Sequence, residues 1–350
     1  MKNSLFFLLC IAVTITTSAQ KQITLQSTSG VYQFDTPDSA IAHANDGDQI
    51  FIPGGIYNIG TLKINKSVMI FGAGHFHDST IATGESYLIG NIILSNGASG
   101  GLITGFDING NISVDTFGTD SVSNYTISRC SFNNLALSST GRAPTNARNF
   151  SIYENIIKGN ISGAKATGIN ISKNFIQGFV EYIQSGVILN NDFLGLGNCT
   201  SLINQMKSVK FTTVDNNIFL FVPPACAGAA FFDTGCANNV FMNNLFTMTL
   251  SFPISSNTGF NNYISQPANS IFISAAGNTF SYTDNYHLKA TSPGVYGGTD
   301  NFDNGVYGTL EPFKIASVPF NPHIQQKSIG QNTNPQGLLN IQIRIAAQDH

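Results

Sequence analysis

Tryptophan is absent from the 350-residue chain, and only 10% of the residues are charged. The net charge is −3, and no run of basic residues is present that would bind nucleic acid or an anionic membrane. After the first 19 residues, no apolar run reaches the roughly 20 residues that a membrane-spanning helix needs. We therefore expect no nucleic-acid partner and no transmembrane segment, and any aromatic platform for a sugar ring must use tyrosine.

Asparagine is abundant, at 39 residues, and it recurs in the pattern apolar-x-x-Asn-x-apolar. The pattern occurs nine times at intervals of 16 to 27 residues, with these residues at its fourth position: Phe106, Cys130, Asn155, Asn174, Asn191, Asn217, Asn244, Asn262 and Asn278. A period near 20 with variable insertions is typical of a solenoid, in which each coil packs only against its neighbours. The amide of Asn can bond the same amide in adjacent coils, so we predict that the seven asparagines form a structural ladder.

Other positions of the repeat agree with this interpretation. The residues two places after the fourth position are all large and apolar, which predicts strands that point this side chain into a core. Gly110, Gly159, Gly178 and Gly195 stand four places after it, where we expect a corner with positive φ. The residues one place before it, Arg129 and Lys173 among them, should point outward.

Both ends of the chain carry signals of their own. Lys2, an apolar run from Leu5 to Val13 and a small residue at Ala19 predict a secretory signal peptide at residues 1–19, cleaved near Ala19. Residues 36–44 predict a short helix with Thr36 as its cap, which would cover the first coil. At the other end, residues 309–350 read as a capping segment and a hairpin, because residues 341–345 alternate strictly.

The N-terminal segments resemble a known family. Gly47-Asp48-Gln49-Ile50-Phe51-Ile52-Pro53-Gly54-Gly55, followed by residues 64–72, is similar to the opening of right-handed parallel β-helix proteins of the pectate-lyase-like superfamily. Residues 286–308 resemble the last coil of secreted β-helix proteins from Bacteroidetes. With the repeat, the resemblance covers roughly residues 31–290 and implies an all-β, right-handed parallel β-helix, which we expect to span residues 20–308. It leaves activity open, because this fold carries lyases, hydrolases, esterases and adhesins.

Four cysteines follow the predicted signal peptide. Cys130 occupies a ladder position, so we expect a buried free thiol. Cys199 and Cys226 lie eight and nine residues past consecutive ladder positions, so they should stack and could form a disulfide, although Cys226 could pair with Cys236 instead. No spacing of cysteine and histidine matches a zinc site, and we predict neither metal nor cofactor.

One group of cations could support a reaction. Arg129 and Lys173, with Arg142 and Arg148, could supply the base and the cation that a lyase needs to remove the proton beside a uronate carboxylate. The alternative, which we favour, is an ion ladder in which Glu154 pairs with both neighbours. No pair of aspartates has the placement that a hydrolase of this fold requires.

Ligand contacts, if present, would use the tyrosines Tyr125, Tyr153 and Tyr182. His75 and His77 could ligate a metal, but a loop with both rings in solvent fits their surroundings better. We therefore predict a secreted, monomeric β-helix protein with a structural, adhesive or carbohydrate-contacting role at the bacterial surface or in the periplasm. The alternative is a polysaccharide lyase acting on a uronate-containing polysaccharide.

Overall fold

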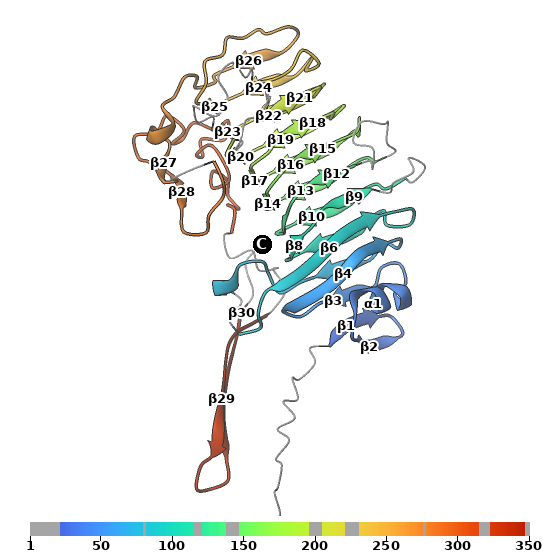
Figure 1. The fold of residues 1–350 in the computed structure, drawn as a ribbon. Coiled ribbons are helices and arrows are strands. Elements are labelled where there is room, and N and C mark those ends of the chain that lie inside the picture. The colour runs from blue at the N-terminus through green and yellow to red at the C-terminus, as the bar shows by residue number, and fades with distance from the viewer. Residues whose placement is uncertain are drawn as a thin grey trace, which may run out of the picture.

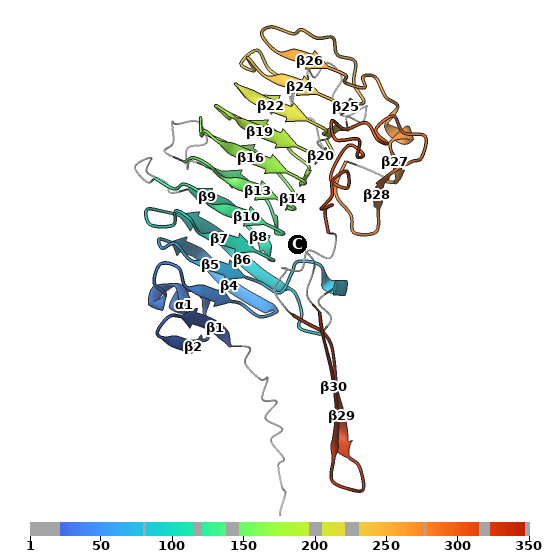
Figure 2. The ribbon, with the colours of Figure 1, turned by 180° about the vertical axis from the view of Figure 1, so that it is seen from behind.

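Three ladders of short parallel strands, stacked coil upon coil, build an elongated solenoid (Figures 1 and 2). The computed structural model describes residues 22–79, 82–114, 121–137, 147–195, 205–220, 231–275, 278–314 and 323–346. The predicted signal peptide lies outside these ranges. No described helix is long and apolar enough to span a membrane.

The first ladder forms a 12-stranded sheet. In order, its strands are β2 (Gly30–Phe34), β1 (Ile23–Ser27), β3 (Gln49–Phe51), β5 (Met69–Phe71), β7 (Leu102–Thr104), β10 (Thr126–Ser128), β13 (Ser151–Tyr153), β16 (Ile169–Ser172), β19 (Gly186–Leu189), β22 (Thr212–Asp215), β24 (Val240–Met242) and β26 (Thr258–Phe260). Pairing is parallel from β3 onward, and the register aligns the apolar residues of the repeat, as in Ile127 beside Ile103 and Ile152.

The second and third ladders diverge from two long strands, β4 (Gly55–Ile64) and β6 (Ser86–Leu94). The second ladder continues through β8 (Asp107–Asn109), β11 (Ser131–Phe132), β14 (Ile156–Ile157), β17 (Phe175–Ile176), β20 (Asp192–Phe193), β23 (Ile218–Phe219) and β25 (Leu245–Phe246). The third continues through β9 (Ile112–Val114), β12 (Leu135–Ala136), β15 (Ile161–Ser162), β18 (Val180–Glu181) and β21 (Met206–Lys207).

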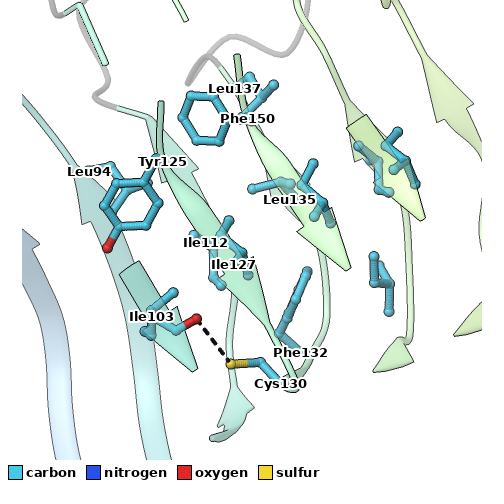
Figure 3. Packing of buried hydrophobic residues seen from close by; sticks show 14 of the residues in the cluster. Leu94, Ile103, Ile112, Tyr125, Ile127, Cys130, Phe132, Leu135, Leu137 and Phe150 are labelled. Atoms are coloured by element: carbon cyan, nitrogen blue, oxygen red, sulfur yellow. Dashed lines mark hydrogen bonds between the residues drawn. The ribbon is translucent and has the colours of Figure 1, made fainter. Parts of the chain in front are cut away.

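The core runs along the axis between the ladders. Figure 3 shows inward side chains from all three, with Ile127 of the first ladder, Phe132 of the second and Leu135 of the third fully buried. The predicted cap is confirmed: α1 (Pro37–His43) begins after Thr36, whose hydroxyl accepts a bond from Ser39 N, and it buries Ala40 and Ile41 over the first coil.

The asparagine ladder occupies the corner between the first and second ladders. The side-chain Oδ1 of Asn174 accepts bonds from both the backbone N and the Nδ2 of Asn155, each at 2.9 Å, and Asn155 Nδ2 also donates to Ile127 O. The same contacts recur through Asn191, Asn217, Asn244 and Asn262. Buried backbone N–H groups at the corners from Cys130 to Asn244 are satisfied in this way.

Two details of the prediction are wrong, and the first is the position of the corner. The residue with positive φ is the one before each ladder position, such as Glu154 (φ 57°) and Lys173 (φ 55°). Gly110, Gly159 and Gly178 do not have positive φ, although Gly195 does (φ 83°). These three glycines are needed for space, because a Cβ at Gly159 would lie 2.9 Å from a backbone oxygen of the adjacent coil.

The second error is the last repeat. The first ladder ends at β26, so neither the repeat around Asn278 nor residues 286–308 add a strand to it. After the short helix η2 (Ala268–Ser270), the chain instead forms the antiparallel pair β27 (Phe272–Ser274) and β28 (Asn285–Leu288) and returns along the outside of the second ladder (Figure 1). We call residues 268–275 and 278–314 the fold-back segment.

Two further elements complete the described structure. The short helix η1 (His77–Ser79) lies in the loop between β5 and β6. The predicted C-terminal hairpin consists of β29 (His323–Thr333) and β30 (Leu339–Ala346), which pair antiparallel and extend away from the solenoid (Figures 1 and 2). The hairpin therefore does not cover the last coil.

Candidate functional site

The predicted ion ladder lies at the corner between the first and second ladders. Arg129 Nε is 2.8 Å from Glu154 Oε2, and Lys173 Nζ is 3.2 Å from Glu154 Oε1. The three residues occupy equivalent positions on consecutive coils, and all three have left-handed φ values, so their side chains point to the same side of the solenoid. Both cations engage one buried carboxylate, so neither is placed as a free base beside a substrate.

The side chains at this corner point outward, as predicted, but the fold-back segment covers them. Lys173 Nζ donates to Glu311 O at 3.0 Å, and Asn190 Nδ2 donates to Gly308 O at 3.1 Å. Only 4% of the Glu154 side chain is exposed. A polysaccharide chain therefore has no access to the ion ladder.

The remaining predicted cations do not join this group. Arg148 is exposed and precedes β13, whereas Glu154 follows it, so the two lie at opposite ends of the strand. Arg142 lies outside the described residues. The three cations that the structure describes, Arg129, Arg148 and Lys173, are therefore not brought together into a lyase-like site.

The predicted tyrosines do not form a platform. Tyr125 is fully buried, and Figure 3 shows its ring in the core near Leu94, so it cannot stack on a ligand. Tyr153 belongs to β13 of the first ladder and lies 5.9 Å from Lys173 Nζ, whereas Tyr182 follows β18 of the third ladder. Because they lie on different ladders, these rings cannot contact one sugar together.

His75 is buried rather than solvated, contrary to expectation, whereas His77 is exposed. His75 Nδ1 forms a hydrogen bond with the hydroxyl of Tyr282 in the fold-back segment, and the ring of Phe76 stacks on Tyr282 at 4.3 Å. Burial lowers the pKa of His75 to about 3. No group of three metal-ligating side chains occurs among the residues that the structure describes.

Cys130 is the buried free thiol that the sequence predicted. Burial raises its pKa to about 12, so it is unreactive in the folded state. Cys236 is also a buried free thiol, which removes it as a disulfide partner. Cys199 and Cys226, whose pairing was predicted, lie outside the described residues.

Two buried carboxyl groups under the fold-back segment were not predicted as a feature of the fold. Asp192 Oδ1 accepts a bond from Val306 N at 3.3 Å, but Oδ2 is buried without a hydrogen-bond partner in the described structure. Desolvation raises the pKa of Asp192 well above its ordinary value, and it also raises the pKa of Asp215, whose Oδ2 accepts a bond from Thr299.

The sequence did contain a signal for this covering layer. The residues one place after the ladder positions point away from the core, and several of them are apolar, including Ile156, Phe175, Ile218 and Leu245. An outward apolar row needs a cover, and residues of the fold-back segment supply it. Phe175, for example, packs 4.7 Å from the ring of Tyr286 and 5.0 Å from that of Phe313.

The third ladder has an accessible groove of about 390 Å³ on its outer face. We call it the third-ladder groove, and it is lined by Thr61, Asn91, Ile93, Asn111, Ser113, Asn134 and Ala136. The lining consists of three side-chain amides, the hydroxyl groups of Thr61 and Ser113, and the aliphatic side chains of Ile93 and Ala136, with no charged residue among them. Such a surface suits an uncharged ligand that is rich in hydroxyl groups.

A second asparagine ladder, which the repeat pattern did not predict, forms hydrogen bonds from coil to coil along the edge of this groove. Asn91 Oδ1 accepts a bond from Asn111 N at 2.9 Å, and Asn134 Nδ2 donates to Asn111 Oδ1 at 2.8 Å. Asn134 Oδ1 accepts from Asn160 N at 2.8 Å. These bonds fix the amides before any ligand arrives, so binding would cost little side-chain entropy.

Comparisons with known proteins add no relative to this description. No protein-family model matches the chain, and a search of curated proteins finds no significant match. The functional conclusions therefore rest on the geometry of the solenoid and of its surfaces.

Proposed function

We propose that the chain is a right-handed parallel β-helix of the pectate-lyase-like type, secreted to the bacterial surface or the periplasm, that binds neutral polysaccharide without cleaving it. Three stacked ladders, an amide ladder at the corner and a helix over the first coil support the fold assignment. The predicted signal peptide at residues 1–19 supports the location.

The third-ladder groove is the observation that carries the binding function. Its strands repeat at about 4.8 Å, so each coil presents a new row of amide or hydroxyl groups along the axis. A glycan chain laid along the groove would exchange hydrogen bonds with Thr61, Asn91 and Ser113 and place its apolar ring faces on Ile93 and Ala136. The groove is shallow and lacks aromatic rings, so we expect dissociation constants of about 10 µM to 1 mM, or about −7 to −4 kcal/mol.

The groove also favours a neutral ligand over an anionic one. A uronate polymer would lose part of the hydration of each carboxylate there, and the nearest cation is the single exposed Lys63, which lies beside Ile93 at one end of the groove. The lyase alternative further requires a free base, whereas Arg129 and Lys173 both engage Glu154. These observations support binding over the lyase.

The proposal is tested by calorimetry with cello-, xylo-, manno- and laminarihexaose, and with hexagalacturonate as the anionic comparison. We expect at least one neutral hexasaccharide to bind and hexagalacturonate to bind at least ten-fold more weakly. Ser113→Arg would place a long side chain in the groove and reduce binding at least ten-fold. Thr213→Arg, at a partly exposed position on β22 of the first ladder, is the matched control and should leave binding unchanged.

Two results would overturn this function. One is the absence of binding to every neutral hexasaccharide. The other is release of unsaturated oligosaccharide from hexagalacturonate or from a longer uronate polymer, followed by absorbance, which would establish the lyase instead.

A further inference from the structure

A second cleft opens within the fold-back segment, beside β28, and has a volume of about 580 Å³. We call it the fold-back cleft, and it is lined by Asp284, Asn285, Tyr286, His287, Asp303, Tyr307, Pro312 and Phe313. Its size falls within the range of small-molecule sites, about 300–1,000 Å³. It differs from the third-ladder groove in having aromatic rings and carboxylates.

The aromatic wall is rigid and partly open to solvent. The exposed ring of His287 stacks on Tyr307 with the centroids 4.0 Å apart and the planes at 18°. Tyr307 is held from behind, because its ring lies edge-on to those of Phe313 and Phe175, at 6.3 Å and 6.4 Å. A ligand would meet a preformed ring stack and would not have to order it.

Two carboxylates, those of Asp284 and Asp303, line the cleft, and no lysine or arginine is among the lining residues. His287 is the one lining side chain that can carry a positive charge. Both carboxylates are oriented by the protein: Asp303 Oδ1 accepts from Tyr296 N at 3.0 Å, and Asp284 Oδ2 accepts from Tyr286 Oη at 3.3 Å. A carboxylate attracts an ammonium group strongly at short range, and salt weakens this attraction near a protein surface.

We propose that the fold-back cleft binds the ammonium group of an amino sugar, with Asp284 and Asp303 facing the charge and the ring stack of His287 and Tyr307 facing the sugar ring. This inference rests on the proposed function in one respect, because the saccharide is taken from it. The positive charge of the ligand is inferred from the cleft alone. An anionic sugar is excluded from the cleft by the same two carboxylates.

The test compares two ligands with the same sugar backbone, one carrying ammonium groups and the other neutral acetamide groups. Hexaglucosamine and hexa-N-acetylglucosamine are titrated by calorimetry into the full-length protein at pH 6 and low salt. We expect the free amine to bind at least ten-fold more tightly than the acetylated form and to lose affinity as salt is added. The double variant Asp284→Asn, Asp303→Asn should lose this preference, whereas Ser113→Arg in the third-ladder groove should retain it.

Several outcomes would contradict the proposal. Equal affinity for the two hexasaccharides, or no binding of either, would overturn it. Equal binding of spermidine in place of hexaglucosamine would show that the cleft takes any polyamine and would overturn the sugar assignment. If the double variant fails to fold, His287→Ala must weaken binding of hexaglucosamine by a factor of several, and an unchanged affinity would refute the ring-stack contact.

The two proposals fail separately. If neutral hexasaccharides bind, Ser113→Arg abolishes that binding and the free amine is not preferred, only the fold-back cleft is ruled out as a site. Binding of hexaglucosamine that depends on the two aspartates, without binding of any neutral hexasaccharide, removes the third-ladder groove and leaves the cleft.

Discussion

Replacement of Asn191 by leucine should destabilise the solenoid strongly, although the two side chains are similar in size. Asn191 is fully buried in the corner ladder. Its Oδ1 accepts from Asn174 N at 3.0 Å and from Asn174 Nδ2 at 2.9 Å. Its Nδ2 donates to Ile171 O, Leu189 O and Asn217 Oδ1. All five bonds depend on the amide.

The magnitude follows from the groups that leucine leaves without a partner. The backbone N–H of Asn174 loses its acceptor inside the protein, which costs about 1–3 kcal/mol. Each remaining bond contributes about 0.5–1.5 kcal/mol net, and several of those partners keep a second bond. We expect Asn191→Leu to lower the free energy of unfolding by about 3–5 kcal/mol, which is a large share of the 5–15 kcal/mol typical of a folded protein.

The assay is urea unfolding followed by circular dichroism, with Asn170→Leu as the matched control. Asn170 belongs to β16, as Ile171 does, but its side chain is exposed, so its replacement should change the free energy by less than about 0.5 kcal/mol. Asn190 is unsuitable as a control: it is buried, has φ 53° and bonds the fold-back segment. Equal losses of stability in Asn191→Leu and Asn170→Leu would refute the role assigned to the amide ladder.

Three further predictions concern the fold-back segment. Asp192→Asn should stabilise the protein at pH 7. The pKa of Asp192 is raised in the folded state, so the wild-type free energy of unfolding falls as pH rises above about 4, the pKa of aspartate in the unfolded chain. A stability gain that is as large at pH 3.5 as at pH 7 would contradict this. The lowered pKa of His75 implies that the protein loses stability as pH falls from about 6.5 toward 3. The urea midpoint of His75→Phe should therefore change less between pH 7 and pH 5 than that of the wild type. Equal changes would show that His75 does not cause the pH dependence. Phe175→Ala should cost about 3–5 kcal/mol and increase hydrogen exchange in residues 268–314, whereas Phe260→Ala, at a 56% exposed position, should do neither.

The sequence predicted those parts of the fold that a short-range repeat encodes. Six asparagines from Asn155 to Asn262 stack as expected, because each coil needs the same amide at the same corner. The cap at Thr36 was also predictable, because a capping residue followed by proline acts locally. The pairing of Glu154 with both Arg129 and Lys173 followed from their equivalent positions on adjacent coils.

The path of the chain after β26 could not be predicted in the same way. Asn278 matches the repeat by its neighbours, but the fold-back segment, which begins at residue 268, leaves the stack. It packs on the second ladder through contacts more than 100 residues apart, such as Val306 with Asp192. The pattern also does not distinguish a glycine that adopts positive φ, such as Gly195, from one such as Gly159, where the backbone of the adjacent coil leaves no room for a Cβ. The accessibility of the ion ladder depends on this covering layer, so the sequence alone could not predict it.

Hydrogen–deuterium exchange with and without the tightest-binding neutral hexasaccharide tests most directly whether the third-ladder groove is the binding surface. Strands β4, β6, β9 and β12 carry the groove, so their amides should exchange more slowly when the ligand is saturating. The first ladder should be unaffected, and Ser113→Arg should abolish the protection. Protection confined to the first ladder, or protection that survives Ser113→Arg, would contradict the account.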